Sequence, residues 1–263
     1  MLVNHKKAQS MEITLTIILI CCAAFFIAGF VDSIAGGGGL ITMPVLLLLG
    51  LPAHYTLGTA KLSSWLGSLT ALIPFWRKGA VIKEVVILGV ITSYLGAAGA
   101  SGVTLLLSNE LMTIIMIFML PLGLLISLFC GALKLDDQPL PKKGLWWRVS
   151  AIGLSVGFYE GFFGPGAGSF FLIGIHLLLH AGLVKSSGTA KAFNIAGNLG
   201  AVTTFASAGT VVYALAVPCA IASILGNHLG AAYAVKVGPR LIRNMLYVVL
   251  FMLLVSLVVK FVI

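Results

Sequence analysis

The sequence predicts an all-α integral membrane protein made of two inverted repeats of transmembrane helices. Composition, a duplicated series of motifs and the placement of basic residues lead to this fold class. Of the 263 residues, 60% are hydrophobic and only 9% are charged, whereas a soluble domain has about 45–50% apolar and about 25% charged residues. So few charges cannot cover a water-facing surface, which excludes a soluble globule or a disordered chain. The apolar runs also lack the strict alternation of an outer-membrane barrel.

The net charge has an ordinary explanation in a membrane protein. The chain has 16 Lys and Arg against 7 Asp and Glu, giving a formal net charge of +9. Most basic residues stand in short loops between apolar runs, which is the usual positive-inside signal. We therefore expect a lipid bilayer as the surrounding partner and no nucleic acid. The four cysteines form no CxxC pair, so neither a metal site nor a disulfide is predicted.

The halves of the chain carry the same series of motifs. The tetrapeptide GTAK occurs at residues 58–61 and again at 188–191, an offset of 130. Upstream of it the offset is 128, and there Asp32 matches Glu160. Such a duplication predicts two structural repeats. We expect an N-terminal tail at 1–12, a first membrane repeat at 13–133, a linker at 134–148 and a second membrane repeat at 149–263.

Each half contains five apolar runs in the same order. A helix rises about 1.5 Å per residue and the hydrocarbon core is about 30 Å thick, so the first run is long enough to cross and the second is too short. The predicted runs are 13–31, 38–50, 56–76, 85–107 and 111–133 in the first half, and 147–163, 169–181, 187–206, 212–235 and 241–263 in the second. Inversion requires an odd number of crossings per half. Either all five runs cross, or the first two form a broken, re-entrant pair.

The N-terminal run is kept as part of the mature protein. Lys6 and Lys7 followed by an apolar run are also typical of a signal peptide. However, this run leads directly into a segment that is duplicated in mid-chain, and a cleaved segment would not be the first element of a repeat unit. We therefore expect it to form the first membrane helix.

The basic residues lie in different loops in the two copies. The loop before residue 85 is basic in the first half, and the loop after residue 235 is basic in the second, whereas their counterparts are not. These basic residues are Arg77, Lys78 and Lys83 in the first half and Lys236, Arg240 and Arg243 in the second. Equivalent loops therefore lie on opposite sides of the membrane, an architecture shared by many secondary transporters. We expect the linker in the cytoplasm, both termini outside, and the protein in the cell's inner or plasma membrane.

A glycine cluster interrupts an apolar run in each half. Such glycines can serve tight helix packing. Because the cluster is duplicated and Pro165 interrupts one copy, we favour broken helices that line a cavity. Helices restarting there would aim free N–H groups at an anion. The predicted binding residues of the clusters are Gly36, Gly37, Gly38, Gly39, Gly164, Gly166, Gly168 and Ser169.

Four charged residues lie in or directly beside the apolar runs at equivalent positions of the two halves. Lys61 and Lys191 end the GTAK motifs; they either snorkel to the interface or contact an anion, which we favour because intramembrane cations mark pathways. Asp32 and Glu160 stand four residues before their glycine clusters. These acids either couple a proton to transport or have a structural role, pairing with a lysine or accepting backbone N–H groups.

Polar residues follow each GTAK motif at helical spacing. Ser64 follows the first, and Asn194 and Asn198, one turn apart on one face, follow the second. They either hydrogen-bond between helices or bind a polar solute. His176 and His180 are also one turn apart, but no third ligand recurs nearby, so no metal site is predicted. The sequence shows no catalytic arrangement either, and we expect neither an enzyme nor a cofactor.

The motifs resemble those of a known family. The segments AGFVDSIAGGGGLITMPVLLLLG and GTAKLSS, then GFYEGFFGPGAGSFF and GTAKAFNIAGN, look like the TauE/SafE family of membrane permeases across essentially the whole chain. That family is linked to sulfite, sulfoacetate and other organosulfur anions. The resemblance implies a transporter of such anions, with residues 36–39, Lys61, residues 164–168, Lys191 and Asn194 lining the path.

Together, these observations predict an alternating-access carrier of a small sulfur oxyanion or sulfonate, with protons as the candidate coupling ion. An anion channel, a carrier of other small organic anions and a non-transporting membrane protein are the alternatives. The sequence leaves open the exact substrate, the direction of transport and the oligomeric state.

Overall fold

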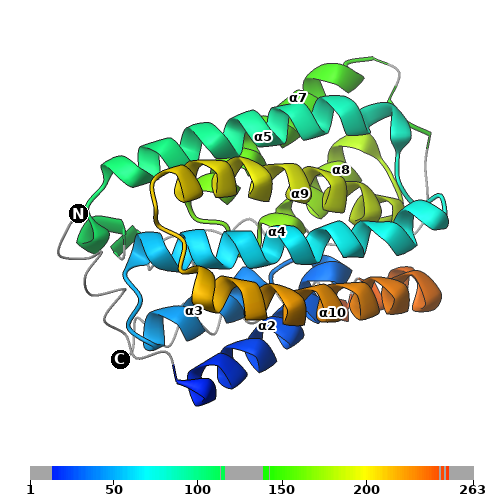
Figure 1. Ribbon diagram of the computed structural model, residues 1–263. Coiled ribbons are helices and arrows are strands. Elements are labelled where there is room, and N and C mark those ends of the chain that lie inside the picture. Colours follow the sequence, from blue (N-terminus) through cyan, green and yellow to red (C-terminus); the bar gives the residue numbers. More distant parts are fainter. Residues whose placement is uncertain are drawn as a thin grey trace.

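The computed structural model describes residues 14–112, 114–115, 139–141, 143–242, 244–245 and 247–248. These residues are mostly helical and form no strand, which confirms the all-α fold class. The helices, labelled as in Figure 1, are α2 (Leu15–Ala35), α3 (Gly39–Leu48), α4 (Ala53–Arg77), α5 (Lys83–Leu106), α7 (Leu145–Phe162), α8 (Ala167–Leu179), α9 (Leu183–Ser207) and α10 (Tyr213–Val237). The predicted tail, most of the predicted runs at 111–133 and 241–263, and the first residues of the linker lie outside the described residues.

Each half has the same order of helix lengths. A long helix, a short helix and two long helices follow one another, with 21, 10, 25 and 24 residues in the first half and 18, 13, 25 and 25 in the second. The short helices rise only about 15–20 Å at about 1.5 Å per residue. Neither α3 nor α8 can therefore span the hydrocarbon core alone.

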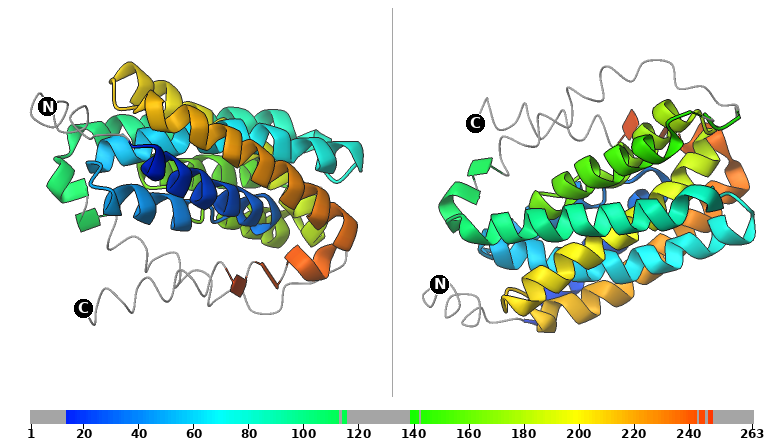
Figure 2. Two further views of the ribbon diagram at one scale, coloured as in Figure 1. Left: turned by 60° about the horizontal axis from the view of Figure 1, so that its bottom comes forward. Right: turned by 90° about the horizontal axis from the view of Figure 1, so that it is seen from above.

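The long helices of one half pack on those of the other. In Figure 1, α5 lies against α7, α10 lies against α2, and α4 and α9 form the centre. The two further views in Figure 2 show the same long helices running side by side. Hydrogen bonds also recur with the 130-residue offset: Thr189 Oγ1 accepts from Ile82 N, and Thr59 Oγ1 from Val212 N, both at 3.0 Å. Equivalent residues of the two copies thus make equivalent hydrogen bonds between the halves.

Glycines permit the close approach at these interfaces. A Cβ on Gly96 of α5 would come within 2.6 Å of Leu154 O in α7. At the equivalent position in α10, a Cβ on Gly226 would overlap Phe26 O in α2. Small residues of this kind let helix backbones touch in membranes, where packing replaces the hydrophobic effect as the force between helices.

Apolar side chains face outwards and polar ones lie inside. Leu15 of α2 is 72% exposed and Ile87 of α5 is 75% exposed. Three described helices, α2, α5 and α10, are long and apolar enough to cross a membrane. The central helices α4 and α9 hold the GTAK motifs, whose lysines are buried. This arrangement suits a membrane protein whose interior, rather than its surface, holds the polar groups.

The helices extend past the bounds that hydropathy predicts. α2 continues to Ala35, beyond the run predicted to end at residue 31, because Asp32 and Ser33 face the protein interior rather than lipid. α7 begins at Leu145, so Arg148 of the predicted linker lies within a helix. Its guanidinium donates to Leu178 O at 2.8 Å, which ties the start of α7 to the end of α8.

Candidate functional site

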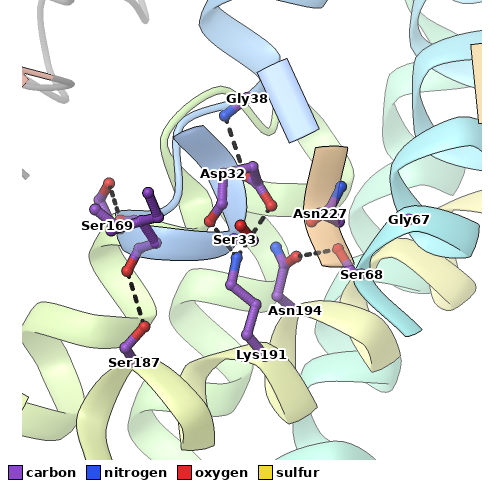
Figure 3. Close-up of polar contacts among 12 residues, drawn as sticks. Asp32, Ser33, Gly38, Gly67, Ser68, Ser169, Ser187, Lys191, Asn194 and Asn227 are labelled. Atoms are coloured by element: carbon purple, nitrogen blue, oxygen red, sulfur yellow. Dashed lines mark hydrogen bonds and ion pairs between the residues drawn. The ribbon is translucent and has the colours of Figure 1, made fainter. Parts of the chain in front are cut away.

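The two glycine breaks lie directly against each other. α2 ends at Ala35, and Gly36 follows with φ +83°, a conformation that turns the chain towards α3. A Cβ on Gly36 would overlap the amide nitrogen of Ser169 in α8. The hydroxyl of Ser169 donates to Ala35 O at 2.8 Å (Figure 3). The breaks therefore form one junction between the halves, and a side chain at Gly36 would separate them.

The second break makes room for a lysine. Gly164 has φ +101° and separates α7 from α8. A Cβ on Gly164 would lie 2.6 Å from Lys61 Nζ. Lys61 belongs to α4 of the other half and is buried. Glycine at this position thus allows the ammonium group of the first repeat to reach the helix break of the second.

Each lysine is paired with the acid of the opposite half. Lys191 Nζ lies 3.0 Å from Asp32 Oδ2 and also donates to the backbone carbonyl of Asp32 (Figure 3). The other oxygen, Oδ1, accepts from Gly38 N at 3.0 Å. Asp32 therefore holds Lys191 and also binds the amide at the start of α3, so its carboxylate is well satisfied.

The second pair is looser. Lys61 Nζ lies 3.7 Å from Glu160 Oε1. That oxygen accepts instead from Asn194 Nδ2 at 2.6 Å. Glu160 Oε2 is buried and has no hydrogen-bond partner among the described residues. A carboxylate with one unsatisfied oxygen is costly in a buried site, which makes this pair the weaker of the two.

A hydrogen-bond network extends from Glu160 along the central helices. Asn194 Oδ1 accepts from Ser68 Oγ in α4 and from Asn198 Nδ2, each at 3.2 Å. Asn198 Nδ2 also donates to Asn194 O at 2.9 Å. Figure 3 shows Asn194 beside Lys191, with Ser68 facing it. The amides therefore link the acid–lysine groups to both central helices.

These groups surround a buried cavity of about 30 Å³. It lies between the glycine breaks and the central helices. Its lining residues are Asp32, Gly39, Thr42, Met43, Ala60, Lys61, Ser64, Glu160, Gly164, Gly166, Ala167, Gly168, Asn194 and Asn198. A cavity of this size has room for a water molecule or two. Gly166, Ala167 and Gly168 belong to the N-terminal end of α8, where a helix favours negative charge.

Most of the residues predicted from the motifs meet at this cavity, and several do not. Gly36, Ser169 and Lys191 lie at the junction but outside the lining, as does Gly37. Gly38 lines a neighbouring cavity instead. Sequence reasoning missed Thr42, Met43 and Ala60. Thr42 had a usable signal, because it is a polar residue one turn into the helix that restarts after the glycines. The other two are small or apolar and resemble ordinary core residues.

Comparisons with known proteins identify the family of this chain. Residues 21–257 match the family described as sulfite exporter TauE/SafE. The chain belongs to that family. It is 36% identical over 252 residues to a probable membrane transporter protein of Haemophilus influenzae, covering 94% of this chain and 97% of the relative. It is 34% identical over 227 residues to the probable membrane transporter protein ORF9 of a Sinorhizobium species, covering 86% of each chain.

A third relative has a similar name. The chain is 35% identical over 224 residues to the probable membrane transporter protein YfcA of Escherichia coli K12, covering 85% of this chain and 82% of the relative. No solved structure matches the chain. Members of the TauE/SafE family and these relatives are membrane transporters and not enzymes, and this chain is a membrane transporter with a small-molecule substrate.

The cavity holds hydrogen-bond donors beside its two carboxylates, Asp32 and Glu160. Among the described residues, no group of three His, Cys, Asp or Glu side chains is placed to hold a metal. His176 Nδ1 instead lies 2.7 Å from Ala181 O. The cavity of this family member combines an ammonium group, two side-chain amides and a helix N-terminus, each of which can donate to an anion.

Proposed function

We propose that this protein carries a small sulfur-containing anion, such as sulfite, sulfoacetate or a related sulfonate, across the membrane by alternating access. The observation that carries the proposal is the cavity that joins Lys61, Asn194, Asn198 and the first turn of α8. Ammonium and amide donors around one small space are the groups that bind an oxyanion through charge-assisted hydrogen bonds. The family name supports an oxyanion whose central atom is sulfur.

The anion competes with a carboxylate for Lys61. The cavity of about 30 Å³ is smaller than a sulfonate, so binding requires it to widen. The pair most easily separated is Lys61–Glu160, because its atoms are already 3.7 Å apart. When the anion takes the place of Glu160 beside Lys61, the negative charges lie close together. That repulsion favours protonation of Glu160.

Proton coupling is therefore assigned to Glu160. The ionised groups Asp32, Lys61, Glu160 and Lys191 sum to no net charge, so an anion would enter without compensation. Protonation of Glu160 leaves the site with one positive charge. Asp32 is the poorer candidate because both of its oxygens accept hydrogen bonds, from Gly38 and Lys191. Glu160 Oε2 has no partner among the described residues and is free to take a proton.

The inverted repeat supplies the conformational change. With residues 13–133 and 149–263 as repeats of opposite orientation, rocking one against the other exposes the junction to either side in turn. The short α3 and α8 support a re-entrant first pair in each repeat. In the inner membrane, this topology places the linker at 134–148 in the cytoplasm and both termini outside. A protease-accessible tag in the linker, cleaved only from the cytoplasmic face of membrane vesicles, tests the orientation.

Flux into proteoliposomes tests the function. The purified protein is reconstituted, and uptake of sulfite, sulfoacetate, thiosulfate and a carboxylate control is measured with and without a pH gradient. Saturable uptake of a sulfur anion that follows the gradient is the expected result. Lys61→Met should abolish it in folded protein, whereas Lys78→Met, an exposed lysine at the end of α4, should not. Flux that does not saturate would identify a channel, and flux unaffected by Lys61→Met would refute this binding site.

A further inference from the structure

A second, smaller cavity lies next to the first. It measures about 10 Å³, room for one water-sized occupant. Its polar lining comes from α2, α3, α4 and α10, together with the glycine break. These polar lining residues are Asp32, Gly38, Thr42, Ser64, Ser223 and Asn227. Asp32, Thr42 and Ser64 also line the larger cavity, so an occupant of one cavity would lie close to an occupant of the other.

Two oxygens of this cavity have no partner. Thr42 Oγ1 and Asn227 Oδ1 are buried and accept or donate no hydrogen bond among the described residues. The residues are only 2% and 1% exposed. Asn227 Nδ2 donates to Ser223 O at 3.0 Å and lies 3.2 Å from Ser223 Oγ, which orients the amide. A buried polar atom without a partner is costly, so two in one small cavity indicate a missing ligand.

The equivalent positions of the two repeats lack this cavity's chemistry. With the offsets of 128 and 130, Thr42 of the first repeat corresponds to Phe170, and Asn227 of the second repeat corresponds to Ala97. Apolar side chains thus stand at both equivalent positions, and neither supplies an oxygen ligand. A structural role shared by the two repeats would not require this difference. The oxygens of Thr42 and Asn227 therefore indicate a specialised site.

We propose that this second cavity binds a sodium ion. The oxygen ligands in the lining are the Asp32 carboxylate, which also accepts from Gly38 and Lys191, the hydroxyls of Thr42, Ser64 and Ser223, and the amide oxygen of Asn227. Hard cations take oxygen ligands of these kinds, and broken helices in transporters supply such sites. Lys191 approaches Asp32 from α9 and is not part of the lining, so no ammonium group fills the position.

A sodium ion would supply positive charge that balances the transported anion. This role of the ion in coupling rests on the proposed function. A divalent sulfur anion carries two negative charges, and protonation of Glu160 supplies only one compensating charge. A sodium ion in the adjacent cavity supplies the second. The bound ion also joins α3 of the first repeat to α10 of the second through Thr42 and Asn227, so its binding stabilises the packing between the two repeats.

Sodium binding is tested without any transported anion. The thermal unfolding midpoint of the purified full chain is titrated with sodium chloride, at constant ionic strength and constant chloride with choline or potassium as the replacement. Sodium should raise the midpoint saturably and more than either replacement. In Asn227→Ala, which introduces the residue of the other repeat, the half-saturating sodium concentration should rise at least about tenfold, because one ligand oxygen is lost. Thr42→Val should do the same.

Ser93→Ala is the matched control. Ser93 corresponds to Ser223 in the other repeat, its hydroxyl is buried and also lacks a partner among the described residues, and it does not line the cavity. Its sodium response should equal that of the wild type. A wild-type response no larger in sodium than in potassium or choline overturns the site, as does an unchanged half-saturation in both cavity variants. Anion uptake is measured separately, so loss of transport with retained sodium binding counts against the proposed function alone.

Discussion

The two acid–lysine pairs occupy equivalent positions, yet the chain treats them differently. Asp32 and Lys191 are 3.0 Å apart, and the carboxylate also binds the amide of Gly38. Lys61 and Glu160 are 3.7 Å apart, and one carboxylate oxygen has no partner in the described structure. A duplicated motif has therefore produced one closely held pair and one looser pair.

The difference follows the neighbours of each acid. Asp32 precedes Gly38 by six residues, and its Oδ1 accepts from the Gly38 amide at the start of α3. Glu160 Oε1 accepts instead from Asn194 Nδ2 in α9. In the first repeat the position of Asn194 is occupied by the shorter Ser64. The two acids therefore have different hydrogen-bond partners, although both line the cavity.

Removing each lysine gives the largest expected contrast. Lys191→Met should lower the free energy of unfolding by about 3–5 kcal/mol, because it leaves the mostly buried Asp32 carboxylate without its ion pair. Lys61→Met should cost clearly less, since Glu160 keeps its bond from Asn194. The measurement is the unfolding midpoint of both variants in detergent, with Lys78→Met as the exposed control. Equal losses in the two variants would show that the pairs are equivalent.

Neutralising each acid separates function from structure. Glu160→Gln should fold normally and lose the dependence of uptake on a pH gradient, because the amide cannot exchange a proton. Asp32→Asn should instead reduce the yield of folded protein, since Lys191 becomes a buried unpaired charge. Uptake with and without the gradient is compared with the amount of folded protein for each variant. A pH-dependent Glu160→Gln transporter would remove Glu160 from the coupling step.

Much of the fold could be predicted from the duplicated sequence. The order of the helices follows from the apolar runs, and the short runs at 38–50 and 169–181 correspond to α3 and α8. Hydropathy misplaced the end of α2, because a residue such as Asp32 reads as a boundary although it faces the protein interior. Hydropathy indicates which residues favour contact with lipid. It therefore misjudges polar residues that face the interior of the protein.

The site could be predicted only in part, for a related reason. Motif matching brings Lys61, Lys191 and the acids to notice, but the partner of each is set by packing between helices distant in the chain. Motif matching also treats the two copies alike. Thr42 and Asn227 lie at positions where the copies differ, so motif matching does not identify them. Differences between repeats are therefore a better guide to specialised residues than the shared motifs.

Filling the space beside Glu160 should have an intermediate effect. A Cβ on Gly197 in α9 would overlap Glu160 Oε2. Gly197→Ala should therefore destabilise the protein by about 1–3 kcal/mol, as overpacking does, and should alter uptake through the displaced carboxylate. Gly99→Ala in α5 is the control, because nothing lies within 4 Å of its Cβ position. Unfolding midpoints and uptake distinguish the two. A stable, fully active Gly197→Ala would show that Oε2 readily moves.

The smallest contrast concerns the network around Asn194. Ser68 in α4 corresponds to Asn198 in α9, and both donate to Asn194 Oδ1 at 3.2 Å. Ser68→Ala should cost only about 0.6 kcal/mol, the average for a hydrogen bond between helices in a membrane, because Asn198 still satisfies the same oxygen. The double variant with Asn198→Ala leaves that oxygen without a donor, so the combined loss in unfolding free energy should exceed the sum of the single losses. Additive losses in unfolding free energy would show that Ser68 and Asn198 contribute independently.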